Sequence, residues 1–260
     1  MANISEAIDL RRDGAGTWLV CADGDHQSIS GMFGGWTAAV VLGAVLRSAE
    51  SDVTPAALTI NFLGAIPAGG DVAISAEPLR VGSAVQHWRA DVRTTVDGTL
   101  RATALVVLAR RRPSEPHVQP AMPEAPDPSS LEMIHAPPPQ GLQTDLRMAS
   151  GAYGSGDTNS IHWMKDMAGR PLDHLLLAYL ADQYAPRSFF WGVGFRPSAT
   201  ITMSVYFHAT AEEIDAVGDD YILNEAVGTR GEGSTSGQQA RLWSRHGALL
   251  ATTEQLAWYR

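Results

Sequence analysis

The sequence predicts an α+β fold that contains two copies of one unit, each an antiparallel sheet wrapped around a long helix. One observation is that the same order of signals, an apolar helix and then four alternating segments, occurs twice. A second is that a proline-rich stretch separates the two occurrences. A third is the composition, because 45% hydrophobic and 18% charged residues are typical of a folded globular protein. The 260 residues suffice for two units of about 100 to 130 residues each.

The proline-rich stretch marks the boundary between the copies. Nine of the fifteen prolines lie between Pro113 and Pro139. Proline lacks the N–H that a sheet ladder needs, and it biases the preceding residue toward extended backbone. We therefore expect a first unit at 1–112, a surface linker at 113–140 and a second unit at 141–260.

Each copy begins with an apolar helix. Residues 31–49 predict the first helix, with a glycine-rich start and a stripe of small residues, and residues 171–186 predict the second. Alternating segments bounded by turns follow each helix and predict four strands. They lie at 57–66, 71–83, 84–98 and 99–111 in the first copy, and at 199–209, 220–234, 236–247 and 248–260 in the second.

Matching turns support the repeat. The stretch 97–104 resembles 246–253, and 60–65 resembles 205–209. Strands that alternate leave one face of each sheet to bury, and wrapping the sheet around the helix buries it. Two such sheets can join edge to edge, which removes exposed edges. This arrangement is a double hot-dog fold.

Charge and motifs exclude several classes of function. The net charge of −9 argues against general affinity for nucleic acid or an anionic membrane. A single cysteine, Cys21, allows no internal disulfide and no cysteine-rich zinc site, and no signal-peptide or membrane-spanning pattern is visible. Motifs of serine hydrolases, zinc hydrolases and dinucleotide-binding folds are missing, so we expect no metal and no cofactor. A cytoplasmic protein is expected.

Several stretches resemble the type II acyl-CoA thioesterases of bacteria and peroxisomes, which are double hot-dog proteins. In the first copy these are "MFGGWTAAVVLGA", "NFLGAIPAGGD" and "AEPLRVGSA"; in the second they are "HLLLAYLADQYAP", "TITMSVYFH" and "LLATTEQLAW". The resemblance implies an acyl-CoA substrate. It also implies that Asp182, Thr200 and Gln255 hold the water that attacks the thioester.

The sequence departs from the family at two places. Relatives commonly carry glutamine where this chain has Trp36, and often an acidic and a basic residue where it has Thr202 and Met203. These departures bear on the acyl preference, and they motivate a second hypothesis, a non-hydrolytic acyl-CoA-binding protein. A third hypothesis is an enoyl-CoA hydratase, for which only Asp23, Asp25 and His26 are candidates, in an ill-fitting pattern.

Asp182 has the chemistry of a general base. Helical spacing places it on a stripe of small residues, so it would point into a narrow space. Loss of water and the negative end of its helix would both raise its pKa. The alternative is a solvated residue on a fraying last turn before Pro186. Thioester hydrolysis needs only an aligned water that is relieved of a proton.

The first copy provides an internal comparison. Aligning the repeats pairs Gln255 with Val106, Thr200 with Pro55, and Asp182 with approximately Ala44. The first copy thus lacks an equivalent polar set, which favours a site specific to the second copy. Taken alone, Gln255 and Thr200 are equally compatible with ordinary strand positions.

Further residues complete the expected site. The start of the first helix, at Gly34 and Gly35, could present free backbone N–H groups to the thioester carbonyl, although tight packing explains the glycines equally well. Acyl-pocket candidates are Phe33, Trp36, Phe189, Phe190 and Trp191. A weak candidate for the coenzyme A phosphates is the cluster Arg110, Arg111 and Arg112. His26 is expected at the surface, and the chain is expected to form a homodimer or larger assembly.

Overall fold

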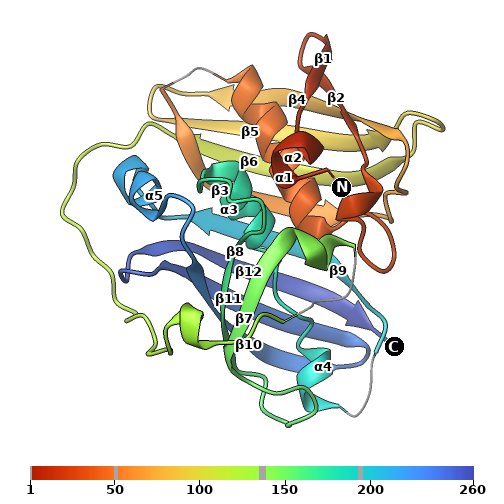
Figure 1. The fold of residues 1–260 in the computed structure, drawn as a ribbon. Coiled ribbons are helices and arrows are strands. Elements are labelled where there is room, and N and C mark those ends of the chain that lie inside the picture. Colours follow the sequence, from red (N-terminus) through yellow and green to blue (C-terminus); the bar gives the residue numbers. More distant parts are fainter. Residues whose placement is uncertain (1, 50–51, 135–138, 193–195) are drawn as a thin grey trace.

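The computed structural model describes residues 2–49, 52–134, 139–192 and 196–260. Within these ranges, all the named strands belong to one twelve-stranded sheet in the order β1-β2-β4-β5-β6-β3-β9-β12-β11-β10-β8-β7. The sequence predicted two sheets that join edge to edge, and the structure contains a single sheet instead. The copies do join edge to edge, but hydrogen bonds between β3 and β9 make the sheet continuous (Figure 1).

The first half supplies one end of this sheet. Its strands are β1 (Arg11–Gly14), β2 (Thr17–Cys21), β3 (Thr54–Phe62), β4 (Asp71–Val81), β5 (Val85–Thr94) and β6 (Leu100–Ala109). Its helices are α1 (Ile4–Ala7) and α2 (Gly34–Ser48). The four strands expected after the helix are present, and β1 and β2 add a hairpin that the sequence pattern did not predict.

The second half repeats this order. Its strands are β7 (Thr144–Ser150), β8 (Ser160–Asp166), β9 (Ser198–Phe207), β10 (Ile222–Glu232), β11 (Thr235–Ser244) and β12 (Leu249–Tyr259). Its helices are α3 (His174–Leu180), α4 (Ser188–Trp191) and α5 (Ala211–Val217). Read outward from the β3–β9 junction, the two halves have equivalent strand orders, so the internal repeat is confirmed.

The register of the strands repeats as well. Phe62 lies opposite Ala102 in the first half, and Phe207 lies opposite Ala251 in the second. Both strand pairs contain a register shift at the equivalent place, near the start of β3 and of β9. The β4–β5 and β10–β11 pairs also share a shift. Bulges at matching positions indicate that the two halves descend from one folded unit.

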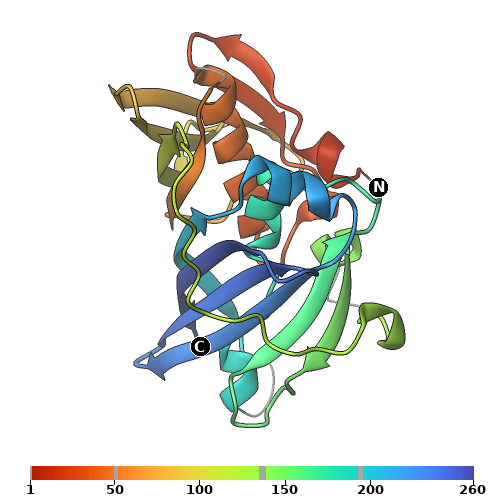
Figure 2. The same cartoon turned by 90° about the vertical axis from the view of Figure 1, so that its left-hand side faces the viewer.

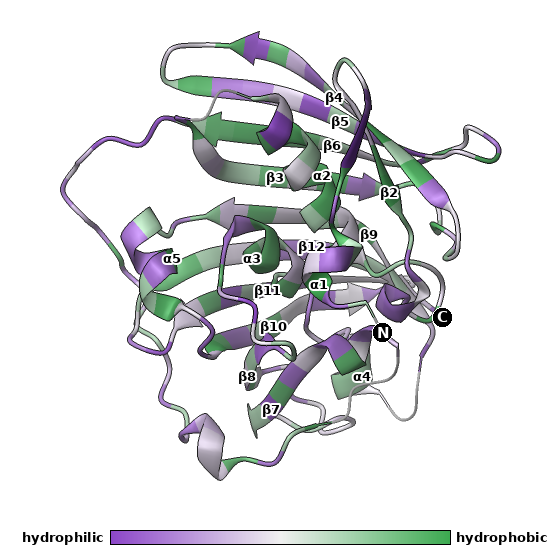
Figure 3. Cartoon of the chain, turned by 45° about the horizontal axis from the view of Figure 1, so that its top comes forward, coloured by the Kyte–Doolittle hydropathy of each residue, from purple (hydrophilic) through white to green (hydrophobic). Residues whose placement is uncertain are grey.

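Helices α2 and α3 lie against each other inside the curved sheet, and they are largely hydrophobic (Figure 3). Gly35 packs on the Tyr179 carbonyl, and Gly43 packs toward Leu175, so the helices run in opposite directions. The second helix is much shorter than expected and ends at Leu180 rather than near 186. Pro186 cannot continue a helix and restricts the residue before it, which favours the irregular segment that follows α3.

The linker crosses the outside of the molecule. Residues 113–127 contain no helix or strand and run from the first half to the second (Figures 1 and 2). Its later part packs on the outer face of the second half of the sheet, where Trp163 and Trp243 form a separate apolar cluster. The Trp163 indole donates to the Pro126 carbonyl at 2.8 Å.

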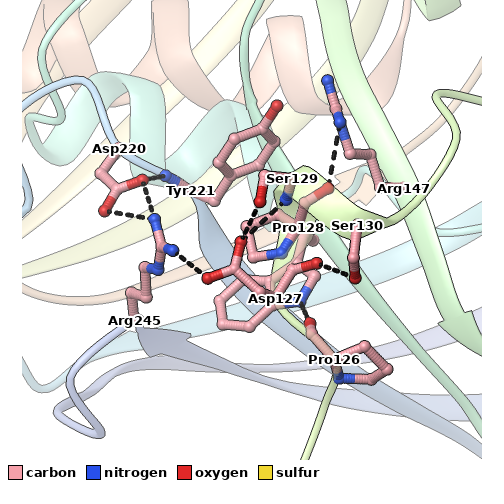
Figure 4. Close-up of polar contacts among 10 residues, drawn as sticks. Pro126, Asp127, Pro128, Ser129, Ser130, Arg147, Asp220, Tyr221 and Arg245 are labelled. Atoms are coloured by element: carbon pink, nitrogen blue, oxygen red, sulfur yellow. Dashed lines mark hydrogen bonds and ion pairs between the residues drawn. The ribbon is translucent and has the colours of Figure 1, made fainter.

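Polar contacts hold the end of the linker (Figure 4). Arg245 pairs with both Asp127 and Asp220, and Arg147 donates to the Pro128 carbonyl at 3.0 Å. Residues 122–131 of the linker are thus packed against the second half of the sheet. No helix within the described ranges is long and apolar enough to cross a bilayer.

Candidate active site

Asp182 lies just beyond α3 rather than on its last turn. Ala181 ends the helix, and tight turns follow, in which the Gln183 amide donates to the Leu180 carbonyl at 2.9 Å. The expectation that Asp182 occupies the helix itself is therefore wrong. The side chain is only partly exposed, and it points toward the first turn of α2 and the inner face of the sheet.

Gln255 joins Asp182 to the sheet. Its Nε2 donates to Asp182 Oδ1 at 2.7 Å, and its Oε1 accepts a long hydrogen bond of 3.4 Å from Thr200 Oγ1. The structure therefore brings the three predicted residues together, although Asp182 and Thr200 meet only through Gln255. In the register, Gln255 faces Met203 as Val106 faces Leu58, which confirms that Gln255 aligns with Val106.

Gln238 extends this chain of side chains and was not identified from the sequence. Its Oε1 accepts from the backbone N–H of Arg187 at 2.9 Å, and its Nε2 donates to Gln255 Oε1 at 2.9 Å. A backbone N–H can only donate, so it fixes which end of the Gln238 amide faces Arg187. Gln238 then fixes the amide of Gln255, whose Nε2 must face Asp182. A signal was present: Gln238 aligns with Trp88, an inward-facing position.

Arg187 is itself buried, with 1% of its surface exposed. Its guanidinium donates to the Thr158 carbonyl at 3.0 Å and to Ser160 Oγ at 2.7 Å, and it lies 4.1 Å from the centre of the Phe190 ring. Burial lowers the pKa of Arg187 to about 10. These contacts hold the segment between α3 and α4, and with it the backbone N–H on which Gln238 depends.

Burial raises the pKa of Asp182 to about 7. The hydrogen bond from Gln255 and the backbone amide of Gly35 favour the ionised form and limit this rise. The start of α2, with its positive end, faces the carboxylate, so the helix dipole acts oppositely to the expectation based on α3 alone. A carboxylate with a pKa near 7 is well matched to accept a proton at neutral pH.

The paired glycines explain how α2 and Asp182 come so close. A Cβ on Gly34 would lie 2.6 Å from Asp182 Oδ2, and one on Gly35 would overlap the Tyr179 carbonyl and the Phe33 ring. Close packing of α2 on α3 therefore requires both glycines. Phe33 offers the first amides of α2 no side-chain cap, and the amide of Gly35 contacts Asp182.

The five predicted pocket aromatics occupy different surroundings. Phe33 is buried against Tyr179 at a ring separation of 5.1 Å. Trp36 is fully buried in the core of the first half, and its indole donates to the Ala7 carbonyl at 2.8 Å. Phe189, Phe190 and Trp191 all lie in α4. Phe190 is covered by Arg187, and Trp191 packs against Tyr259 at 5.8 Å between ring centres.

Two arginines of the predicted phosphate-binding cluster make contacts within the protein. Arg110 pairs with Asp52 at 2.5 Å. Arg111 donates to carbonyls of both halves, Pro55 at 3.1 Å and His208 at 3.1 Å, and so fastens the β3–β9 junction. Arg112 is exposed and contacts no partner among the described residues. Phosphate binding by the cluster stays a prediction, and it is best suited to Arg112.

His26 is not a surface residue, and this expectation was wrong. It is fully buried, with Nδ1 at 3.0 Å from the Tyr179 hydroxyl and Nε2 at 3.1 Å from the Ala2 carbonyl. Residues before α1 fold over the histidine, which the sequence pattern could not reveal. Burial also lowers its pKa, so it acts as a neutral element of the core.

Comparison with known proteins identifies the family. Residues 22–109 match the acyl-CoA thioesterase N-terminal domain, and residues 113–259 match the acyl-CoA thioesterase C-terminal domain. The chain belongs to the acyl-CoA thioesterase family. No curated protein matches it.

Solved structures agree with this fold. A conserved hot-dog protein of unknown function from Alicyclobacillus acidocaldarius is 32% identical, with a TM-score of 0.93 over 99% of this chain and 97% of that one. The tesB protein of Mycobacterium avium subs paratuberculosis is 21% identical, with a TM-score of 0.82 over 99% and 98%. Acyl-CoA thioesterase II TesB2 from Mycobacterium marinum is 19% identical, with a TM-score of 0.78 over 99% and 98%. The hot-dog fold predicted from the sequence is thus confirmed.

Proposed function

We propose that the chain hydrolyses acyl-CoA to a free acid and coenzyme A, with Asp182 as general base. The single observation that supports this most strongly is the bond of 2.7 Å from Gln255 to a carboxylate whose pKa burial raises to about 7. The family match supplies the substrate class.

The proposed reaction uses water as the nucleophile. Gln255 occupies Asp182 Oδ1, which leaves Oδ2, beside Gly34, to take a proton from water. The water oxygen bonds to the thioester carbon as the carbonyl π electrons move to the carbonyl oxygen. The tetrahedral intermediate then breaks its carbon–sulfur bond and expels the coenzyme A thiolate, a good leaving group, which takes up the proton held by Asp182 and so restores the base. Uncapped amides at the start of α2, other than that of Gly35, would stabilise the developing oxyanion. Thr200 and Gln255 would align the water.

The departures from relatives are compatible with this proposal. Thr202 donates to the Ile60 carbonyl at 3.0 Å and so helps to join the halves. Met203 is buried, with its sulfur 3.4 Å from Gln255 Nε2. Neither side chain blocks the hydrogen bond between Gln255 and Asp182. A cytoplasmic location and a homodimer or larger assembly belong to the same proposal.

The decisive experiment is hydrolysis of a panel of acyl-CoA esters by three purified chains. The wild type should release coenzyme A, and Asp182→Asn should reduce kcat roughly 10²- to 10⁴-fold, because it removes the proton acceptor. Glu254→Gln is the matched control, since Glu254 neighbours Gln255 on the exposed face of β12. Undiminished turnover in Asp182→Asn would remove this residue from the mechanism. Tight binding without turnover on any ester would select the non-hydrolytic alternative.

A further inference from the structure

The inner face of the second half contains polar side chains where the first half has apolar ones. The matched registers pair Asn224 with Ile74, Gln238 with Trp88, Thr253 with Ala104, Gln255 with Val106 and His162 with Trp18. The first half shows that this backbone packs well with apolar residues at these places. Buried polar groups reduce stability unless they are hydrogen-bonded, so the polar set requires a reason other than the fold.

Asn224 is the least explained member of this set. It has no exposed surface, and neither its Oδ1 nor its Nδ2 has a hydrogen-bond partner among the described residues. The side chain shares the inner face of β10 with the core residues Ile222 and Ala226. A buried amide left without partners carries its full desolvation penalty. The oxygen of the Asn224 amide accepts hydrogen bonds and its nitrogen donates them, so the amide can bind a group that both donates and accepts, such as a hydroxyl.

Besides its apolar neighbours, Asn224 has a neutral polar group beside it on the adjacent strand β8. Opposite it on β8, His162 lies 3.1 Å from the Gln183 carbonyl, and burial lowers the histidine pKa to about 4, so the ring is uncharged. Gln183 Oε1 is also buried and unpartnered among the described residues. The nearby cation Arg187 already donates to Thr158, Ser160 and Ala185. A neutral hydroxyl suits this environment better than a charged group.

Asn224 and Gln255 lie on the same inner face of the sheet, and Leu242 is the residue directly opposite Asn224 on β11. The small residues Ala226 and Ala240 lie between Asn224 and the strand that carries Thr253 and Gln255. Asn224 is two strands and four residues away from Gln255, roughly 16 Å for strand spacings of about 4.8 Å and rises of about 3.4 Å. A group held at Asn224 would therefore be far from a thioester held at Asp182.

We infer that the acyl group accepted here is a medium to long chain with a hydroxyl at its distal end, bound by Asn224. The inference rests on the proposed function, because it assumes that the thioester lies at Asp182. A site that hydrogen-bonds a substrate hydroxyl discriminates strongly against the analogue that lacks it, because its own polar groups are then left unpaired.

The test compares dodecanoyl-CoA with its ω-hydroxy and β-hydroxy derivatives. We expect kcat/KM to be about tenfold or more higher for the ω-hydroxy ester than for either other ester. Asn224→Ile, which installs the first-half residue, should abolish the preference, so that kcat/KM for the ω-hydroxy ester no longer exceeds that for dodecanoyl-CoA. Asn61→Ile, at an exposed position of β3, is the control and should keep the preference.

In the turnover assay, the inference would be overturned by an equal or reversed preference in the wild type, or by an unchanged preference in Asn224→Ile. If Asn224→Ile lowers thermal stability and leaves the preference intact, Asn224 binds structural water only. Failure of the proposed function is distinguishable, because calorimetric binding to Asp182→Asn needs no turnover. Tighter binding of the ω-hydroxy ester by that variant would support the inference even if no ester were hydrolysed, and equal binding would refute it.

Discussion

Replacing Asp182 with asparagine should stabilise the protein at neutral pH while it removes activity. The folded carboxyl group holds its proton up to a pH of about 7, whereas the unfolded group loses it near 3.8. Between these pH values the folded state binds more protons than the unfolded state, so stability falls as pH rises. Asparagine does not ionise, and the variant lacks this loss.

The magnitude follows from the two pKa values. A rise from 3.8 to about 7 corresponds to about 4 kcal/mol in full burial. Asp182 is partly exposed, and solvent screening reduces the effect, so we expect about 2 kcal/mol. The gain should be present in full above pH 7, shrink as pH falls, and vanish below about pH 4, where both carboxyl forms are protonated.

Urea unfolding of both chains at several pH values between 4 and 8 measures this difference. Asp215→Asn, at an exposed position of α5, is the control and should show no comparable trend. A free-energy difference between wild type and Asp182→Asn that stays constant from pH 4 to 8 would contradict a raised pKa. A variant that is less stable than the wild type at pH 8 would show that the carboxylate serves the fold.

Three further predictions concern the surroundings of the site. Gln238→Leu should lower kcat for acyl-CoA hydrolysis roughly tenfold with a smaller change in KM, because the Gln255 amide loses the hydrogen bond that fixes its orientation. Gln239→Leu, at an exposed position of the same strand, should have no effect in this assay. Gly35→Ala should reduce the free energy of unfolding by about 1 to 3 kcal/mol, because the added methyl group would overlap the Tyr179 carbonyl of α3. Gly14→Ala is the control and should leave the free energy of unfolding unchanged, because a methyl group there would meet no neighbouring atom within 4 Å. Light scattering at low concentration should give at least twice the chain mass of 27.8 kDa, and a clean monomer would contradict the proposed assembly.

Much of the fold could be predicted because the sequence contains it twice. Alternation in the segments after each helix located β3 to β6 and β9 to β12, and the match of Phe62 with Phe207 fixed their relation. The hairpin of β1 and β2 was missed because all residues of β1 are exposed, so no apolar alternation marks it. The length of α3 was overestimated because Ala181 and Ala185 continue the stripe of small residues beyond Leu180, where the helix ends.

The site residues were predicted mainly from the family resemblance. The residues that were missed or misplaced have physical explanations. Asp182, Thr200 and Gln255 follow family motifs, so their sequence positions were recognisable. Gln238 belongs to no motif, and its importance arises from a backbone N–H supplied by a different segment. His26 was misplaced because the residues that bury it come from the first few positions of the chain. Such long-range contacts leave no local pattern.

The composition of the site from both halves constrains how the chain can be divided. The carboxylate and its glutamine come from the later half, whereas the helix end that faces them comes from the earlier half, and the β3–β9 seam holds the two in place. Cleavage of the chain within residues 113–127 would leave the β3–β9 hydrogen bonds intact, so the cleaved protein should keep Asp182, Gln255 and the start of α2 together. Either half produced alone would lack the residues that the other half contributes to the site, and its junction strand, β3 or β9, would become an unpaired sheet edge.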